Sequence, residues 1–284
     1  LSWEFGKGLV AQHQLAVSAG GLAQLRVLAE SWRARGPGDD EVFEFHCSKQ
    51  ATAGDPTSIT LSLGPAELSF GEVRYGVQVD EDRRAVHVTL YHPLFPQLPE
   101  QVRGQLMFVL LDNMVGEDAV ASWLGVLETA GDAPADALEP LAFRALVAGL
   151  PERWSEPGVV MGKATGPDGT PYMVMFSVPR RRWAHPLHDT VAELTLSYEP
   201  EHQGMPDKDT LGRMQDWGEG VHDVLEATAV HLATITGGGE RTLFFALRGE
   251  HGPARRAIDE AVAAFEGARA AVRYDPGWET VPSP

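Results

Sequence analysis

The C-terminal part of the chain constrains the fold most, because strand-like and helix-like patterns follow one another there in a defined order. The predicted elements are a strand at 191–198, a helix at 211–225, strands at 230–236 and 241–247, a helix at 254–265 and a strand at 270–274. Asp207, a residue type that caps helices, precedes the first helix. Gly237-Gly238-Gly239-Glu240 separates the two middle strands and is typical of a hairpin turn.

The resulting order, β-α-β-β-α-β, is the split βαβ arrangement of the ferredoxin-like fold, in which two helices pack on one face of a four-stranded sheet. A further hairpin is expected before it, with strands at 159–164 and 172–178 on either side of Pro167-Asp168-Gly169. We therefore predict that residues 151–284 form one domain, an opening hairpin followed by a ferredoxin-like domain.

Residues 1–150 are expected to form a second domain, since a chain of 284 residues is long enough for two hydrophobic cores. The elements predicted in it are a helix at 9–35, which Gly20-Gly21 could break into two, antiparallel strands within 42–91, and helices at 100–116 and 138–150. Pro151 and Pro157 are expected to end the last helix. The predicted fold class is α+β, with two domains that each consist of an antiparallel sheet packed with helices.

The formal net charge of −17 limits the classes of partner. Such a charge repels phosphate backbones and anionic membrane surfaces, so we predict that the protein binds neither nucleic acid nor membranes. It is compatible with a basic protein surface as partner, and equally with solubility alone. The single cysteine, Cys47, excludes an intramolecular disulfide and favours a cytoplasmic location. Apolar runs such as 106–111 are too short for a membrane span, and we expect no signal peptide.

Short motifs in the C-terminal half resemble a known bacterial family. They are Ala184-His185-Pro186-Leu187-His188-Asp189, Thr234-Ile235-Thr236-Gly237 and Asp275-Pro276-Gly277-Trp278. Residues 159–279 thereby resemble the family called domain of unknown function 695. This resemblance implies a fold, and it implies no catalytic residue, cofactor or metal. The family is structurally similar to regulator of ribonuclease activity B proteins, which are acidic, ferredoxin-like and inhibit a ribonuclease by binding it. That similarity implies a binding role.

One predicted helix carries the strongest candidates for a binding surface. Asp216, Glu219, Asp223 and Glu226 recur at spacings of three and four, and His222 lies among them. This spacing could present paired carboxylates to a metal or to a basic partner. A di-metal site would need histidines at the matching register of a second helix, which are missing. A solvated acidic face and a docking face for a basic protein remain as interpretations.

His185 and His188 form the second candidate, because residues three apart could share a metal on a helix. Pro186 and the strand that follows favour an extended segment, in which the two rings would point to opposite faces. We therefore expect His188 and Asp189 to anchor a loop. Arg180-Arg181-Arg182-Trp183 is the one basic cluster, and we expect it to pair with the acidic surface of the chain itself. Cys47 beside His46 is expected to be structural.

These patterns support two main hypotheses on function. The first is a non-enzymatic binding or regulatory protein that uses its acidic surface, with no catalytic residues and no cofactor. The alternative is an enzyme or small-molecule binder with a site between the two domains. A scaffold that pairs an exposed sheet edge with another copy is a third possibility, and the sequence leaves the oligomeric state open.

Overall fold

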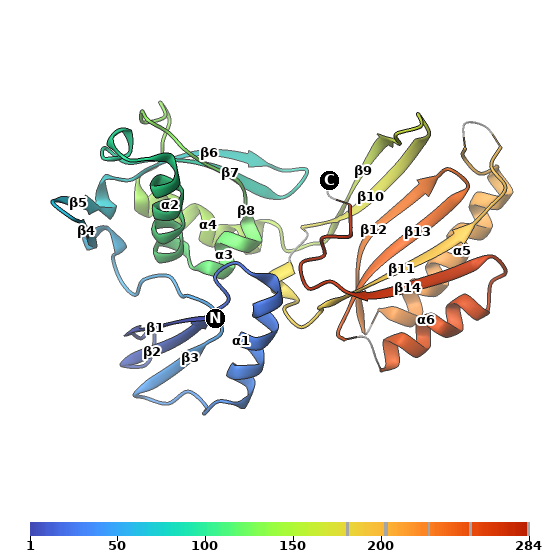
Figure 1. The fold of residues 1–284 in the computed structure, drawn as a ribbon, viewed down its shortest axis with the longest axis horizontal. Helices are drawn as coiled ribbons and strands as arrows, with labels where there is room; N and C mark the ends of the chain where they lie inside the picture. The colour runs from blue at the N-terminus through green and yellow to red at the C-terminus, as the bar shows by residue number, and fades with distance from the viewer. Residues whose placement is uncertain (180–181, 202–203, 227, 250–251, 283–284) are drawn as a thin grey trace. The chain divides into compact units, whose positions relative to one another are not determined.

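The computed structural model describes residues 1–179, 182–201, 204–226, 228–249 and 252–282. The fold is α+β, and the chain forms two compact units, Leu1–Glu156 (unit 1) and Pro157–Pro284 (unit 2). Figure 1 shows the elements of each unit. No helix in these residue ranges is both long and apolar enough to cross a lipid bilayer.

Unit 1 begins with a three-stranded sheet in the order β1-β2-β3. Strands β1 (Ser2–Lys7) and β2 (His13–Ser18) are antiparallel, helix α1 (Ala23–Arg35) follows, and β3 (Phe43–His46) returns parallel to β2. The predicted helix over 9–35 is therefore wrong before Ala23. Gly20 and Gly21 adopt φ values of +59° and +78°, a conformation that turns the chain out of a strand, so the helical pattern begins only after them.

A second three-stranded sheet follows in unit 1, in the order β6-β7-β8. Strands β6 (Arg74–Asp80) and β7 (Ala85–Tyr91) form the predicted antiparallel hairpin, whereas β8 (Leu124–Thr129) lies parallel to β7. The prediction of an entirely antiparallel first domain is thus wrong. A helical connection carries the chain back across the sheet before each of β3 and β8, and such crossovers produce parallel pairs.

The remaining strands of unit 1, β4 (Thr60–Leu63) and β5 (Ala66–Ser69), form a small hairpin. The helices that follow are α2 (Glu100–Val115), α3 (Glu117–Trp123) and α4 (Pro140–Arg153). Helix α4 continues past Pro151, where the sequence predicted its end. The proline lies in the last turn, and the Trp154 N–H still donates to the Leu150 carbonyl at 3.0 Å. Short 3-10 helices occupy Pro56–Ser58, Phe70–Glu72, Phe95–Gln97 and, in unit 2, Arg182–Ala184.

Unit 2 contains one six-stranded antiparallel sheet in the order β14-β11-β13-β12-β10-β9. Its elements are β9 (Gly158–Thr165), β10 (Pro171–Val178), β11 (Thr190–Ser197), α5 (Lys208–Leu225), β12 (Ala229–Gly237), β13 (Glu240–Leu247), α6 (Pro253–Ala263) and β14 (Ala268–Tyr274). Helices α5 and α6 lie together on one face of this sheet (Figure 1). The Asp207 side chain accepts hydrogen bonds from the Asp209 and Thr210 N–H groups at 2.8 Å each, which confirms the predicted cap of α5.

Each face of the unit 2 sheet carries its own core. On the helical face, Met214, Trp217 and Val221 of α5 pack against strand residues such as Leu194 and Leu243. On the opposite face, Trp278 and Val281 from the C-terminal segment cover side chains that include Phe176, Leu232 and Phe244. Because α5 buries one side in this core, its other side is left to solvent.

Candidate functional site

The exposed side of α5 is acidic. Asp216, Glu219, Asp223 and Glu226, which we call the α5 acidic face, are all exposed, whereas Met214, Trp217, Val221 and Leu225 on the other side of the helix are buried. Helix positions three and four apart lie on the same side, so the four carboxylates form one stripe. The spacing of the acidic residues in the sequence predicted this arrangement.

The carboxylates of the α5 acidic face take part in none of the salt bridges among the described residues. Three arginines of unit 2 pair with other carboxylates: Arg255 with Asp259 at 3.1 Å, Arg269 with Glu240 at 2.7 Å and Arg273 with Glu193 at 2.5 Å. The negative field of the stripe is therefore directed to solvent and is available to a partner.

A pocket of about 290 Å³ adjoins this stripe at the C-terminal end of α5. It is lined by His222, Asp223, Leu225, Glu226, Ala229, His231 and Phe245. Two carboxylates of the α5 acidic face thus belong to the pocket, together with three aromatic or heteroaromatic rings. The sequence placed His222 beside the acidic residues, but it did not indicate His231 or Phe245, which come from β12 and β13.

The three rings of the pocket pack against one another. The centroids of His222 and His231 are 4.5 Å apart in a T-shaped contact, and those of His222 and Phe245 are 5.1 Å apart. His231 and Phe245 are opposite each other in the paired strands β12 and β13, with centroids 5.3 Å apart. Phe245 is buried and supports the half-buried rings of His222 and His231, which lie next to the exposed carboxylates. The two imidazoles and the carboxylates suit the alkyl stem and charged head of a cationic side chain.

Both ring nitrogens of His231 have hydroxyl partners. Nδ1 lies 3.0 Å from Ser177 Oγ and Nε2 lies 3.0 Å from Thr234 Oγ1. Burial lowers the pKa of His231 to about 4, and burial also lowers the pKa of His222, against the opposing charge of Asp223. An imidazole with such a low pKa is a weak base at neutral pH, so it activates Ser177 little as a nucleophile. The hydroxyls instead hold a neutral ring in place at the edge of the pocket.

The second predicted pair, His185 and His188, lies in a turn and not in an extended segment. The His188 N–H donates to the His185 carbonyl at 3.0 Å, and the ring centroids are 5.2 Å apart. The prediction that the two rings point to opposite faces is therefore wrong, because the chain turns after the 3-10 helix at Arg182–Ala184. Burial lowers the pKa of His188 to about 4.

Two of the contacts that hold this loop come from Asp189 and His188. Asp189 Oδ1 accepts from the Gly249 N–H at 3.0 Å, and the His188 carbonyl accepts from Trp278 Nε1 at 2.8 Å.

Throughout the described ranges, no group of three or more His, Cys, Asp or Glu side chains is arranged to hold a metal ion.

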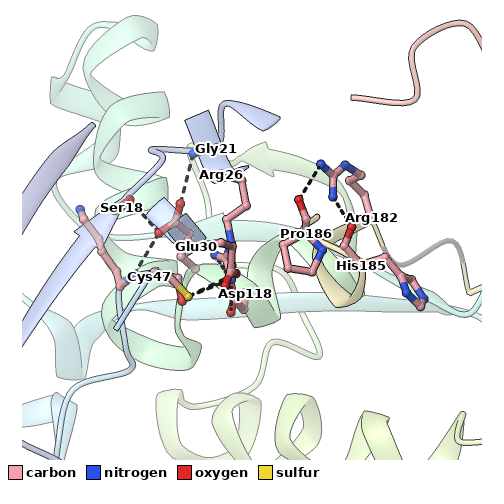
Figure 2. A network of polar contacts seen from close by, with 12 residues as sticks. Ser18, Gly21, Arg26, Glu30, Cys47, Asp118, Arg182, His185 and Pro186 are labelled. Carbon is pink, nitrogen blue, oxygen red and sulfur yellow. Dashed lines mark hydrogen bonds and ion pairs between the residues drawn. The ribbon is translucent and has the colours of Figure 1, made fainter. Parts of the chain in front are cut away.

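The basic cluster is described only in part, because Arg180 and Arg181 lie outside the described residues. Arg182 is buried, and its guanidinium donates to the backbone carbonyls of His185 and Pro186 (Figure 2) and of Pro276. These carbonyl contacts give Arg182 a role in holding the turn that contains the two histidines.

A buried polar network in unit 1 is the feature that sequence reasoning missed. Arg26 of α1 binds Asp118 through Nη1 at 2.7 Å and Glu30 through Nε at 2.9 Å (Figure 2). Cys47 Sγ donates to Glu30 at 3.2 Å, and burial raises the pKa of this thiol to about 11, so it is protonated at neutral pH. A protonated, hydrogen-bonded thiol is a poor nucleophile. The network joins segments that are distant in sequence, which no local pattern indicates.

The sequence was compared with models of known protein families and with curated proteins, and neither comparison produced a match.

Proposed function

We propose that this chain is a non-enzymatic binding protein that docks the α5 acidic face on a basic surface of a partner protein. One observation carries the proposal: Asp216, Glu219, Asp223 and Glu226 form an exposed stripe that enters no salt bridge among the described residues. Unneutralised charge of one sign on a rigid helix increases the rate of encounter with a partner of opposite charge and selects its orientation.

The adjoining pocket supplies the specific part of the interaction. A lysine or arginine side chain of the partner would place its stem on the half-buried rings of His222 and His231 and its charged head near Asp223 and Glu226. Burying one cation beside two carboxylates fixes the register of the complex, while the remaining stripe guides the encounter.

The fold is compatible with this role. We also propose that the two units are separate domains and that unit 2 has the ferredoxin-like fold. The strand order β14-β11-β13-β12, with α5 and α6 on one face, supports that assignment. The resemblance to the domain of unknown function 695 family, and through it to acidic inhibitors that bind a ribonuclease, remains a proposal and points to the same class of function. A cytoplasmic location also remains a proposal.

A pull-down from a lysate of the native source at low salt tests the docking proposal. The wild-type chain should retain a basic protein, and the Asp216→Lys, Glu219→Lys variant should lose at least tenfold of it. The Asp132→Lys, Asp136→Lys variant makes the same change in net charge on an exposed loop of unit 1 and should bind like the wild type. Raising the salt concentration to about 0.5 M should release the partner, because screening shortens the range of the field. Equal loss in both variants, or retention at high salt, would contradict the proposal.

A further inference from the structure

The first strand of unit 1 has an edge without a partner. Strand β1 pairs with β2 on one side only, and it is the outermost strand of its sheet (Figure 1). Its residues are exposed except for Gly6, which is half-buried. An exposed strand edge presents a row of backbone N–H and C=O groups that can pair with another chain.

The opposite edge of the same sheet is blocked by its own connecting loop. The Phe45 N–H donates to Asp39 Oδ1 at 2.9 Å, and the Phe43 carbonyl accepts from the Asp40 N–H at 2.8 Å. The loop before β3 thus occupies the hydrogen-bonding groups of that strand. Nothing comparable covers residues 2–6 of β1 in the described chain. In this small sheet the edge at β3 is therefore covered by a loop, whereas the edge at β1 is open.

The side chains of β1 make this open edge apolar as well. Trp3 is 74% exposed and Phe5 is 54% exposed. Phe5 lies on the same face as His13 and Phe43, with ring centroids 5.3 Å and 6.3 Å away. Monomeric proteins rarely expose a cluster of large aromatic side chains beside an open strand edge, and such a cluster marks an interaction site.

The sequence of β1 is complementary to itself. When a strand pairs antiparallel with its own copy about a twofold axis normal to the sheet, residues directly opposite each other lie on the same face of the sheet. The residue numbers of every opposite pair then add to the same sum, and that sum is even because side chains alternate between the two faces. A sum of 8 would place Glu4 against Glu4, which is repulsive. A sum of 10 places Phe5 opposite Phe5 and Trp3 opposite Lys7, which gives one aromatic pair and two cation–π contacts. Glu4 then lies opposite Gly6, so no like charges are directly opposite each other.

We propose that β1 is a dimerisation strand, which pairs antiparallel with β1 of a second copy of this chain and has Phe5 at the twofold axis. The two three-stranded sheets then form one continuous six-stranded sheet. Each copy carries a formal net charge of −17, so salt should strengthen this dimer by screening the repulsion between the copies. The proposed complex of the α5 acidic face should respond to salt in the opposite direction, which keeps the two proposals separable.

Sedimentation velocity of the full chain, from about 1 µM to about 500 µM, tests the dimer, because this range covers the affinities of small interfaces. We expect a monomer–dimer equilibrium that Phe5→Asp weakens at least tenfold. Phe108→Asp, at a side chain of α2 that is 50% exposed, is the matched control and should leave the equilibrium unchanged. A monomer at every concentration, or a dimer that survives Phe5→Asp, would overturn the proposal.

Cysteine cross-linking tests the register without relying on a destabilising charge. In a Cys47→Ser background, Phe5→Cys should form an interchain disulfide under mild oxidation, because the two residues face each other at the axis. Trp3→Cys should not, because each Trp3 faces Lys7 of the other copy. Equal cross-linking of both variants, or of neither, would reject the proposed pairing.

Discussion

The imidazole rings of His222 and His231 lie in a T-shaped contact with centroids 4.5 Å apart, although one belongs to helix α5 and the other to strand β12. The contact places a half-buried pair of titratable groups next to the exposed carboxylates of Asp223 and Glu226. Burial favours the neutral form of both rings, so folding and protonation oppose each other at this position.

This opposition predicts that His231 makes the free energy of unfolding depend on pH. Its folded pKa of about 4 lies below the ordinary value of 6.5, so between these pH values the unfolded chain binds more protons. The free energy of unfolding should therefore fall as the pH is lowered from about 6.5 to about 4. In His231→Gln this fall should be smaller by roughly 2 kcal/mol. Urea denaturation at several pH values measures it, and an unchanged fall would contradict the prediction. Part of the fall should remain in His231→Gln, because burial also lowers the pKa of His188 to about 4.

Glu44 should stabilise the sheet of β1, β2 and β3 at neutral pH. Its carboxylate accepts from the N–H groups of Leu9, Val10 and Ala11 at 2.6–3.0 Å. Burial alone would raise its pKa, but these bonds and one to His46 outweigh burial and lower the pKa to about 2. Glu44→Gln should cost about 2 kcal/mol at pH 7.

Measurements at acidic pH can test the sign of the contribution that Glu44 makes to stability. A carboxyl with a lowered folded pKa stabilises above its ordinary pKa, and the effect disappears as the pH falls from about 4.5 to about 2. The difference between wild type and Glu44→Gln should shrink over that range in thermal melts. Glu41→Gln, at an exposed position before the same strand, should show no such difference.

Glu117 should be a stronger determinant of stability than its place in the first turn of α3 suggests. It is 5% exposed, and it accepts from Ser18 Oγ at 2.7 Å, the Lys49 N–H at 3.0 Å and the Gly21 N–H at 3.2 Å. Glu117→Ala leaves these donors without an acceptor and should cost about 3 kcal/mol. Glu100→Ala, in the first turn of α2 but exposed, should cost less than about 1 kcal/mol. Equal costs in chemical denaturation would refute this role.

Asp207 should stabilise the start of α5 through its cap. Its carboxylate receives two backbone N–H bonds and a bond from Thr210 Oγ1 at 2.6 Å. Asp207→Ala should lower the free energy of unfolding measured by urea denaturation, and Asp209→Ala, which removes a neighbouring exposed carboxylate, should lower it by clearly less. The pull-down described for the α5 acidic face should be unaffected by Asp207→Ala, because that face lies in the later turns of the helix.

Local patterns in the sequence determined the parts of this protein that depend on neighbouring residues. The cap at Asp207, the hairpin turn after Gly237, the helix of the α5 acidic face and the order of elements in unit 2 follow from spacing and turn chemistry. Gly20 and Gly21 indicated a break in the predicted helix over 9–35, but the apolar run of β2 before them was too short to distinguish a strand from a first piece of helix.

Only the tertiary structure decided which distant residues meet. The parallel return of β8, the ring contact of His222 with His231 and the buried carboxylate of Glu117 join segments that no local pattern relates. The spacing of apolar residues along a helix or strand indicates which side of that element is buried. It carries no information about which other element covers that side. The acidic face of α5 was therefore predictable from the sequence, whereas the pocket beside it required the fold.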